Sequence, residues 1–173
     1  MRDKRVLFLT QAAVIAALYV VLCQLFAPIS FKNIQVRIAE ALTILPFFTP
    51  AAIPGLFVGC LIGNMLGGAI PLDVVFGSAA TLIGAVGTWW IGTRIRKNPA
   101  DSVLKFALPL PPIIANTIIV PLVLYYGYLI TVPIPLQMLT VGIGEVIGCG
   151  VIGMVLFFAV EKSRVQIFGT SAA

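Results

Sequence analysis

Four ionisable side chains stand within or beside the apolar stretches of this sequence: Arg37, Glu40, Asp73 and Glu145. Placing such a group at membrane depth costs at least about 2.5–3.5 kcal/mol on insertion scales, so each is a candidate functional residue. Carboxylates accept hydrogen bonds and a guanidinium donates them, so together these groups can bind a small polar molecule. We therefore expect a pocket for a small organic molecule rather than a pore for inorganic ions.

Each of these residues also has an ordinary structural role open to it. Arg37 and Glu40 are three residues apart and can form an ion pair along one helix. Asp73 can cap the helix that it opens. Glu145 has no basic residue near it in its own apolar stretch, so its partner must come from another helix or from a ligand. Ligand contact is the favoured interpretation for Glu145.

Side-chain amides extend this candidate pocket. In an apolar chain, a buried Asn or Gln either bridges helices or binds the polar edge of a ligand. Phe31, Tyr125 or Tyr128 could stack on a ring, although an interfacial belt is the favoured interpretation of these aromatic residues. The predicted substrate-binding residues are Asn33, Gln35, Arg37, Glu40, Asn64, Asp73, Asn116, Gln137 and Glu145.

Residue types that the chain lacks exclude several kinds of chemistry. Histidine is absent, which excludes Ser-His hydrolases and two-His zinc proteases, and no GxxxxGK phosphate loop is present. Cys23, Cys60 and Cys149 stand singly in apolar runs, and we interpret them as small buried hydrophobic residues. The sequence therefore predicts no metal site, no cofactor in this chain and no enzymatic activity.

The composition defines the class of protein that must position these groups. The chain has 173 residues, of which 60% are hydrophobic and 10% are charged, and its mean hydropathy is +1.11. Soluble domains carry roughly a quarter charged residues, so a soluble domain is excluded. A spanning helix needs about 20 residues, which leaves room for about five to seven spans and no second domain. We predict one membrane domain over residues 1–173.

Apolar stretches and turn residues predict an all-α bundle of six transmembrane helices. The first stretch is too long for the core of a signal peptide, so we expect it to be a retained helix. Pro109, Pro111 and Pro112 predict a loop or a broken helix at the start of the fifth span. The predicted spans are the stretch that ends at Phe26, then 35–49, 51–67, 73–93, 103–126 and 137–160.

The basic residues predict the orientation of the bundle. With both termini in the cytoplasm, nine Lys and Arg residues lie on the inner side and two, Lys32 and Arg37, on the outer side. Cytoplasmic segments of membrane proteins carry this excess of positive charge. The net charge of +5 is explained in this way, and we expect no binding of nucleic acid.

A glycine repeat marks a close helix contact. Gly55, Gly59, Gly63 and Gly67 recur at every fourth position, so they share one helix face and let another helix approach closely. The sequence leaves open whether the partner is a helix of the same chain or of another subunit.

Three segments carry a family resemblance: QVRIAEAL at 35–42, LPFFTPAAIPGL at 45–56 and DVVFGS at 73–78. They resemble the QueT-type family of queuosine-precursor transporters, which are S components of energy-coupling factor (ECF) importers. The resemblance implies a six-helix subunit in a prokaryotic cell membrane that binds its substrate from outside. It also implies a transmembrane T component and two ATPases as partners, which use the ATP and make the S component topple.

The resemblance also implies a docking motif and a substrate class. S components carry an AxxxA signature in their first helix, and this chain has it twice, as Ala12 with Ala16 and as Ala13 with Ala17. The implied substrate is a deazaguanine, whose N–H edge a carboxylate can accept, and Glu40 or Glu145 could hold that edge. The alternatives are an S component for another vitamin-like heterocycle or, ranked lower, a membrane-embedded enzyme or a channel.

Overall fold

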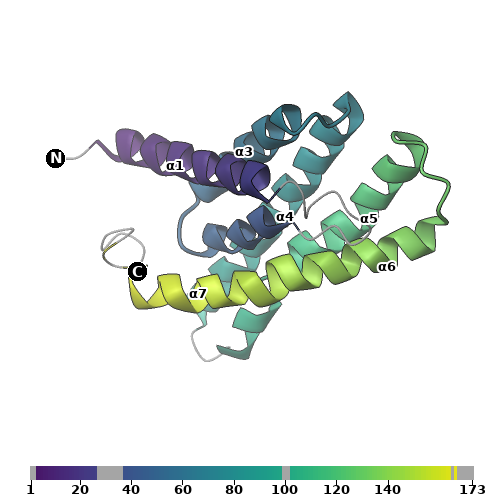
Figure 1. The fold of residues 1–173 in the computed structure, drawn as a ribbon. Coiled ribbons are helices and arrows are strands. Elements are labelled where there is room, and N and C mark those ends of the chain that lie inside the picture. The colour runs from purple at the N-terminus through teal and green to yellow at the C-terminus, as the bar shows by residue number, and fades with distance from the viewer. Residues whose placement is uncertain (1–2, 27–36, 99–101, 165, 167–173) are drawn as a thin grey trace.

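The computed structural model describes residues 3–26, 37–98, 102–164 and 166, and within these ranges it is all-helical. Asn33 and Gln35, two of the predicted site residues, lie outside the described residues. The helices in chain order are α1 (Lys4–Leu25), the 3₁₀ helix η1 (Ile38–Phe47), α3 (Ala52–Leu66), α4 (Pro71–Lys97), the 3₁₀ helix η2 (Ser102–Ala107), α5 (Leu110–Tyr126), α6 (Ile134–Glu145), the π-helix η3 (Val146–Ile152) and α7 (Gly153–Lys162) (Figure 1).

Four helical stretches are long and apolar enough to cross a membrane: Lys4–Leu25, Pro71–Lys97, Val103–Tyr126 and Ile134–Lys162. Two shorter helices, η1 with 10 residues and α3 with 15, cover the predicted second and third spans. Each is about 20 Å long by its rise per residue, against a hydrocarbon core of about 30 Å. The described residues thus form an apolar helical bundle, and the count of six spans stays a prediction.

Helix α1 begins at a capped end and turns most of its apolar surface outward. The Asp3 side chain accepts a hydrogen bond from the backbone N–H of Arg5 at 3.1 Å, which satisfies one free donor of the first turn. Leu9 and Leu18 are exposed, whereas Tyr19 is fully buried. An exposed face this apolar is stable against lipid rather than against water.

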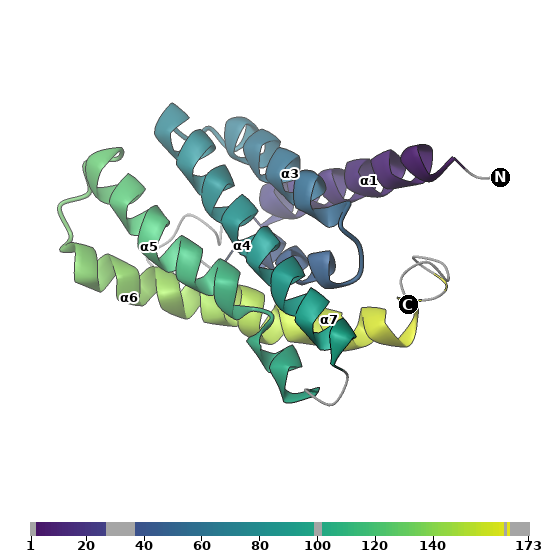
Figure 2. The same cartoon turned by 180° about the vertical axis from the view of Figure 1, so that it is seen from behind.

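The glycine repeat packs α3 against α1 of the same chain. A Cβ atom at Gly55 would lie 2.7 Å from the backbone oxygen of Ala12, and one at Gly59 would lie 3.1 Å from Cα of Ala16. Any side chain at these glycines would collide with the α1 backbone, so the two helices can touch only because the side chains are missing. Figures 1 and 2 show α1 and α3 side by side from opposite directions. The partner helix that the sequence left open is therefore intramolecular.

The predicted break at the start of the fifth span is confirmed. Helix η2 ends at Ala107, and α5 begins at Leu110 directly after Pro109. Pro111 and Pro112 lie against two further glycines, Gly87 and Gly84, so α4 and α5 are in close contact at this end. Proline is accepted in a first helical turn because the N–H groups there have no partner within the helix.

Helix η1 lies in the interior of the bundle and contacts α1, α3, α4, η3 and α7. Every residue from Ala39 to Phe47 is buried. At the C-terminal end of η1 the Phe47 and Phe48 rings pack with Phe157 of α7. The Arg96 guanidinium donates to the backbone oxygen of Phe47 there. A polar residue in η1 is therefore placed in the core, which is where Glu40 stands.

The helical stretch that corresponds to the predicted last span begins at Ile134, and its helix type changes in the middle. Residues Val146–Ile152 adopt the wider π-helical coil between α6 and α7. A Cβ atom at Gly148 would lie 2.9 Å from the backbone oxygen of Arg37, so this coil touches the chain just before η1. π-Helical turns are rare and are often found at functional sites.

Candidate functional site

Glu40 provides a fully buried carboxylate at the centre of the bundle. Its Oε1 atom accepts hydrogen bonds from the Tyr19 hydroxyl of α1 and from the Thr81 hydroxyl of α4, the latter at 2.9 Å. Its Oε2 atom is also buried and has no hydrogen-bond partner among the described residues. A buried acceptor without a donor costs about 1–3 kcal/mol, so this atom is a place for a ligand to donate.

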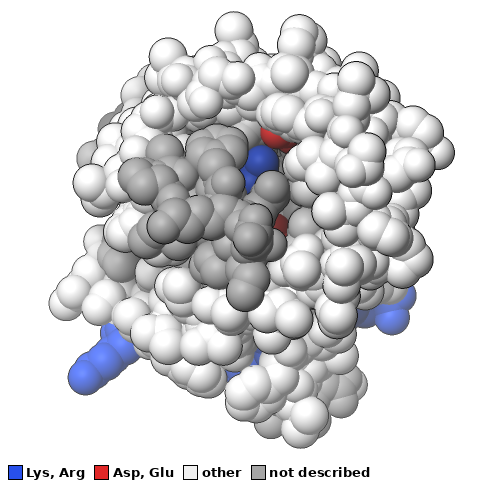
Figure 3. Space-filling view, turned by 45° about the vertical axis from the view of Figure 1, so that its right-hand side comes forward, with Lys and Arg blue, Asp and Glu red and all other residues white. Residues whose placement is uncertain are grey.

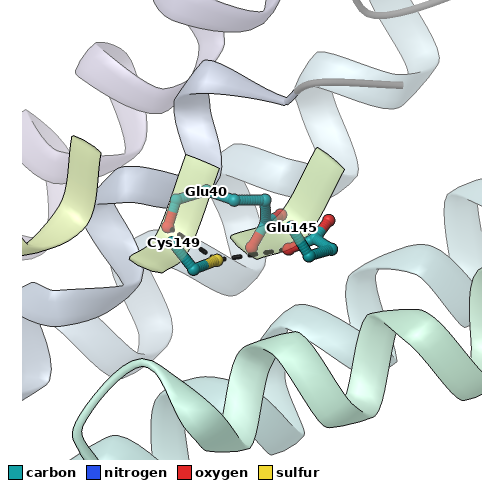
Figure 4. Close-up of side chains that lie close together, drawn as sticks. All are labelled: Glu40, Glu145 and Cys149. Carbon is teal, nitrogen blue, oxygen red and sulfur yellow. Dashed lines mark hydrogen bonds between the residues drawn. The ribbon is translucent and has the colours of Figure 1, made fainter. Parts of the chain in front are cut away.

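Glu145 approaches Glu40 from the junction of α6 and η3, and it is 2% exposed. The Cys149 thiol, four residues later on the same helical face, lies 3.2 Å from Glu145 Oε2 and 3.5 Å from the backbone oxygen of Glu40. One potential ligand atom from each of these three residues lies within 4.8 Å of the others. Figure 4 shows the carboxylates of Glu40 and Glu145 pointing toward one another with the thiol beside them. We call Glu40 and Glu145 the carboxylate pair.

Arg37 and Asp73 form an ion pair that lies nearer the surface of the bundle than the carboxylate pair does. Arg37 Nη2 lies 3.7 Å from Asp73 Oδ2, and both side chains are largely buried. The Tyr128 hydroxyl donates to the same carboxylate oxygen at 3.0 Å and accepts from the backbone N–H of Ile70 at 3.3 Å. Burial and the nearby Asp73 carboxylate raise the pKa of Tyr128, so this phenol stays a donor. We call Arg37 and Asp73 the outer ion pair.

The outer ion pair replaces the two structural roles considered for these residues. Arg37 pairs with Asp73 rather than with Glu40, which instead accepts from two hydroxyl groups. Asp73 lies in the first turn of α4 after the capping position, which Ile70 occupies. Acidic and basic atoms are visible together in a hollow of this face (Figure 3). Residues 37 and 73, which are far apart in the sequence, thus lie in one polar site.

The three described amide side chains, Asn64, Asn116 and Gln137, differ in how many of their hydrogen bonds are made within the protein. Asn64 Nδ2 lies 3.4 Å from the backbone oxygen of Asp73, and Asn64 lines a small cavity together with Arg37. Asn116 is 2% exposed, and its amide nitrogen has no partner among the described residues. Gln137 donates to the backbone oxygen of Val132 at 2.6 Å and so braces the loop before α6. Asn116 and Gln137 each keep one buried amide atom without a partner among the described residues, Nδ2 of Asn116 and Oε1 of Gln137.

Comparison with known proteins gives the family of the chain. The family model described as QueT transporter matches residues 9–162. The chain belongs to the QueT transporter family. The residues of the candidate site, from Tyr19 to Cys149, all fall within this match.

A curated relative points in the same direction. This QueT-family chain is 33% identical over 85 residues to the queuosine precursor transporter QueT of Lactococcus lactis subsp. cremoris (strain MG1363). The alignment covers 48% of this chain and 50% of the relative, so the chain spans about half the length of the curated relative that it matches. Comparison with solved structures finds no match. The chain is thus a member of the QueT transporter family with four helical stretches that are long and apolar enough to cross a membrane.

Three residues of this QueT-family chain that contact the carboxylate pair are not among the substrate-binding residues predicted from the sequence: Tyr19, Thr81 and Cys149. Tyr19 and Thr81 stand in apolar runs, and nothing in their spacing separates them from residues of a helix interface. Cys149 did carry a signal, because it follows Glu145 by four residues and so shares its helical face. It is buried as predicted, yet it contacts a carboxylate rather than apolar side chains alone.

The two AxxxA pairs lie on different faces of α1. Ala12 and Ala16 contact the glycine face of α3. Ala13 and Ala17 lie about a quarter turn further round the helix and are exposed. The first pair is therefore occupied within the chain, and the second is free to contact another protein or lipid.

Proposed function

We propose that this chain is the substrate-binding S component of an ECF importer for a queuosine precursor of the deazaguanine class. In this proposal the chain crosses the cell membrane of a prokaryote six times with both termini in the cytoplasm. It captures its substrate from outside, docks on a transmembrane T component with two ATPases, and topples when they hydrolyse ATP. The chain itself is not an enzyme in this scheme.

The observation that carries the substrate class is a set of buried carboxylate oxygens without a donor among the described residues, Glu40 Oε2 and Asp73 Oδ1, in a QueT-family chain. A deazaguanine has neighbouring N–H donors on one edge and a carbonyl acceptor beside them. Carboxylate oxygens match the donors, and an arginine or an amide N–H matches the carbonyl. Arg37 and Asn116 lie in the same part of the bundle as candidate donors, and Asn116 Nδ2 has no other partner among the described residues.

The partner part of the proposal rests on the exposed small residues of α1. Ala13 and Ala17 leave a shallow strip on the outer face of this helix, and small residues let a second helix approach closely. The family resemblance assigns such a strip to contact with the T component. Ala12 and Ala16 serve α3 instead, so the proposal places docking on the pair Ala13 and Ala17.

Binding measurements on the purified chain in detergent test this function. We expect a deazaguanine precursor to bind, and Glu145→Gln to weaken binding about 10- to 100-fold, because a hydrogen bond to a charged group is lost. Glu161→Gln is the matched control, since Glu161 pairs with Lys105 at 2.9 Å far from the site, and we expect it to bind normally. Unchanged affinity in both Glu40→Gln and Glu145→Gln would contradict the site, and stabilisation by riboflavin, biotin, folate or thiamine alone would contradict the substrate class.

A further inference from the structure

Among the residues that the structure describes, the charges buried around the site do not balance. Arg37 supplies one positive charge and lies against Asp73, which leaves Glu40 and Glu145. Neither glutamate has a basic partner within ion-pair distance among the residues that the structure describes. Both glutamates are almost fully buried: Glu40 is 0% exposed and Glu145 is 2% exposed. A buried carboxylate pair without a cation is costly, because neither charge is solvated and the two repel.

The geometry of the pair leaves one position for a positive group between the two carboxylates. Glu40 Oε1 is occupied by two hydroxyl donors, whereas Oε2 is buried and has no partner among the described residues. The ligand atoms of Glu40 and Glu145 lie within 4.8 Å of each other, close enough for one donor group to contact both. Figure 4 shows that the two carboxylates face each other across this position.

The chemistry of the surroundings favours an ammonium over a metal ion. The Cys149 thiol lies against two acceptors, Glu145 Oε2 and the backbone oxygen of Glu40, so it serves as a hydrogen-bond donor there. A metal ligand must be a thiolate, and those two acceptors would then face a negative sulfur. An ammonium carries three N–H donors in a compact group, and it can be shared between two carboxylates.

We propose that Glu40 and Glu145 form a subsite for a protonated amine, so the transporter selects precursors that carry a positive charge over neutral ones. This inference rests on the proposed function, since it assigns one group of that substrate to one place in the site. The flat base of the ligand then lies toward the outer ion pair, where Arg37 can donate to its carbonyl and Asp73 Oδ1, buried and without a partner among the described residues, can accept from its N–H edge. Specificity arises because a neutral ligand leaves the two buried carboxylates uncompensated.

A matched pair of ligands tests the inference: a deazaguanine with an aminomethyl group and the same base with a nitrile in its place. We expect the purified wild-type chain to bind the amine at least about tenfold more tightly than the nitrile. Glu145→Gln should reduce this ratio to near one, mainly by weakening the amine, and the control Glu161→Gln should retain it. Equal affinities in the wild-type chain, as expected if the carboxylates merely share a proton, would overturn the inference.

A second measurement separates this inference from the proposed function. If neither deazaguanine binds, the proposed function fails, and simple probes then decide the subsite. We expect methylammonium to raise the melting temperature of the wild-type chain but not that of Glu145→Gln, with equimolar sodium as the reference. Absence of this difference would overturn the subsite. Stabilisation by zinc alone, lost in Glu145→Gln and in Cys149→Ser, would replace it with a metal site.

Discussion

At the scale of a single residue, Tyr19 joins α1, the helix on which the proposed function places docking, to the candidate site. Its hydroxyl donates to Glu40 Oε1, while its backbone belongs to α1, which also exposes Ala13 and Ala17. The Tyr19 side chain is fully buried, so its hydroxyl cannot exchange this bond for one to water. A change in the charge or position of Glu40 on ligand binding therefore acts directly on α1.

The substitution Tyr19→Phe tests this link. It keeps the ring and removes the hydroxyl, so Glu40 Oε1 retains only the Thr81 donor. We expect the free energy of unfolding to fall by about 1–3 kcal/mol, because a buried acceptor loses a donor. Thermal melting in detergent and ligand affinity are the measurements. Tyr125→Phe, at a site that is 38% exposed, is the control, and equal effects of the two variants would contradict a special role for Tyr19.

At this scale the sequence predicted the charged residues and missed their hydroxyl partners. A carboxylate in an apolar run is conspicuous because its insertion is costly. Tyr19 and Thr81 are ordinary residues of membrane helices, and only the packing of α1 and α4 around η1 brings them to Glu40. The choice of Asp73 as the partner of Arg37 likewise depends on where α4 begins relative to η1, which spacing alone does not give.

At the scale of elements, the pairing of α1 with α3 decides which alanines are available outside the chain. Both AxxxA pairs have the same spacing, so the sequence cannot distinguish them. The structure distinguishes them, because Gly55 and Gly59 of α3 contact the α1 backbone at Ala12 and Ala16 and not at Ala13 and Ala17. Helix α1 is thus tightly held on one side and open on the other.

Two leucine substitutions on α1 separate these faces. Ala16→Leu should destabilise the chain by about 1–3 kcal/mol, because its side chain must enter the closely packed contact with Gly59. Ala13→Leu should leave the melting temperature unchanged, because Ala13 is exposed, and should reduce co-purification with the T component and ATPases. Melting curves and pull-down from cells that co-express all subunits are the measurements. A loss of stability in Ala13→Leu, or undiminished co-purification, would contradict the assignment of the two faces.

Helix type was less accessible to prediction than helix position. The boundaries predicted for α3 and α4 agree with the structure to within about four residues, and so does the end of α5, whereas the predicted start at residue 103 falls in the separate helix η2. The 3₁₀ coil of η1 and the π-coil of η3 were not predicted, because apolar content fixes that a segment is buried and not how tightly it is wound. The two coils are also close in space, since η3 approaches the start of η1 at Gly148.

At the scale of the whole molecule, the polar groups divide between the two ends of the bundle. Arg94, Arg96 and Lys97 end α4 on one side, and Lys105 with Glu161 lies near them. The outer ion pair lies at the opposite end of α4, near the loop between α5 and α6. Helix α1 begins and α7 ends on the side away from that loop (Figure 1). The structure thus has a basic end and an opposite end that holds the outer ion pair, which we call the binding end because the proposed function places ligand capture there.

Cysteine labelling in intact cells tests the direction of this axis. Lys97→Cys places a thiol at the basic end, and Leu129→Cys places one in the exposed loop at the binding end, where the wild-type side chain is 77% exposed. The excess of positive charge at the first end predicts that it faces the cytoplasm. We therefore expect a membrane-impermeant maleimide to label Leu129→Cys in intact cells and Lys97→Cys only after permeabilisation. The unsubstituted chain is the background control, because Cys60 and Cys149 are buried and should react poorly. The reverse labelling pattern would turn the binding end toward the cytoplasm and would contradict capture from outside.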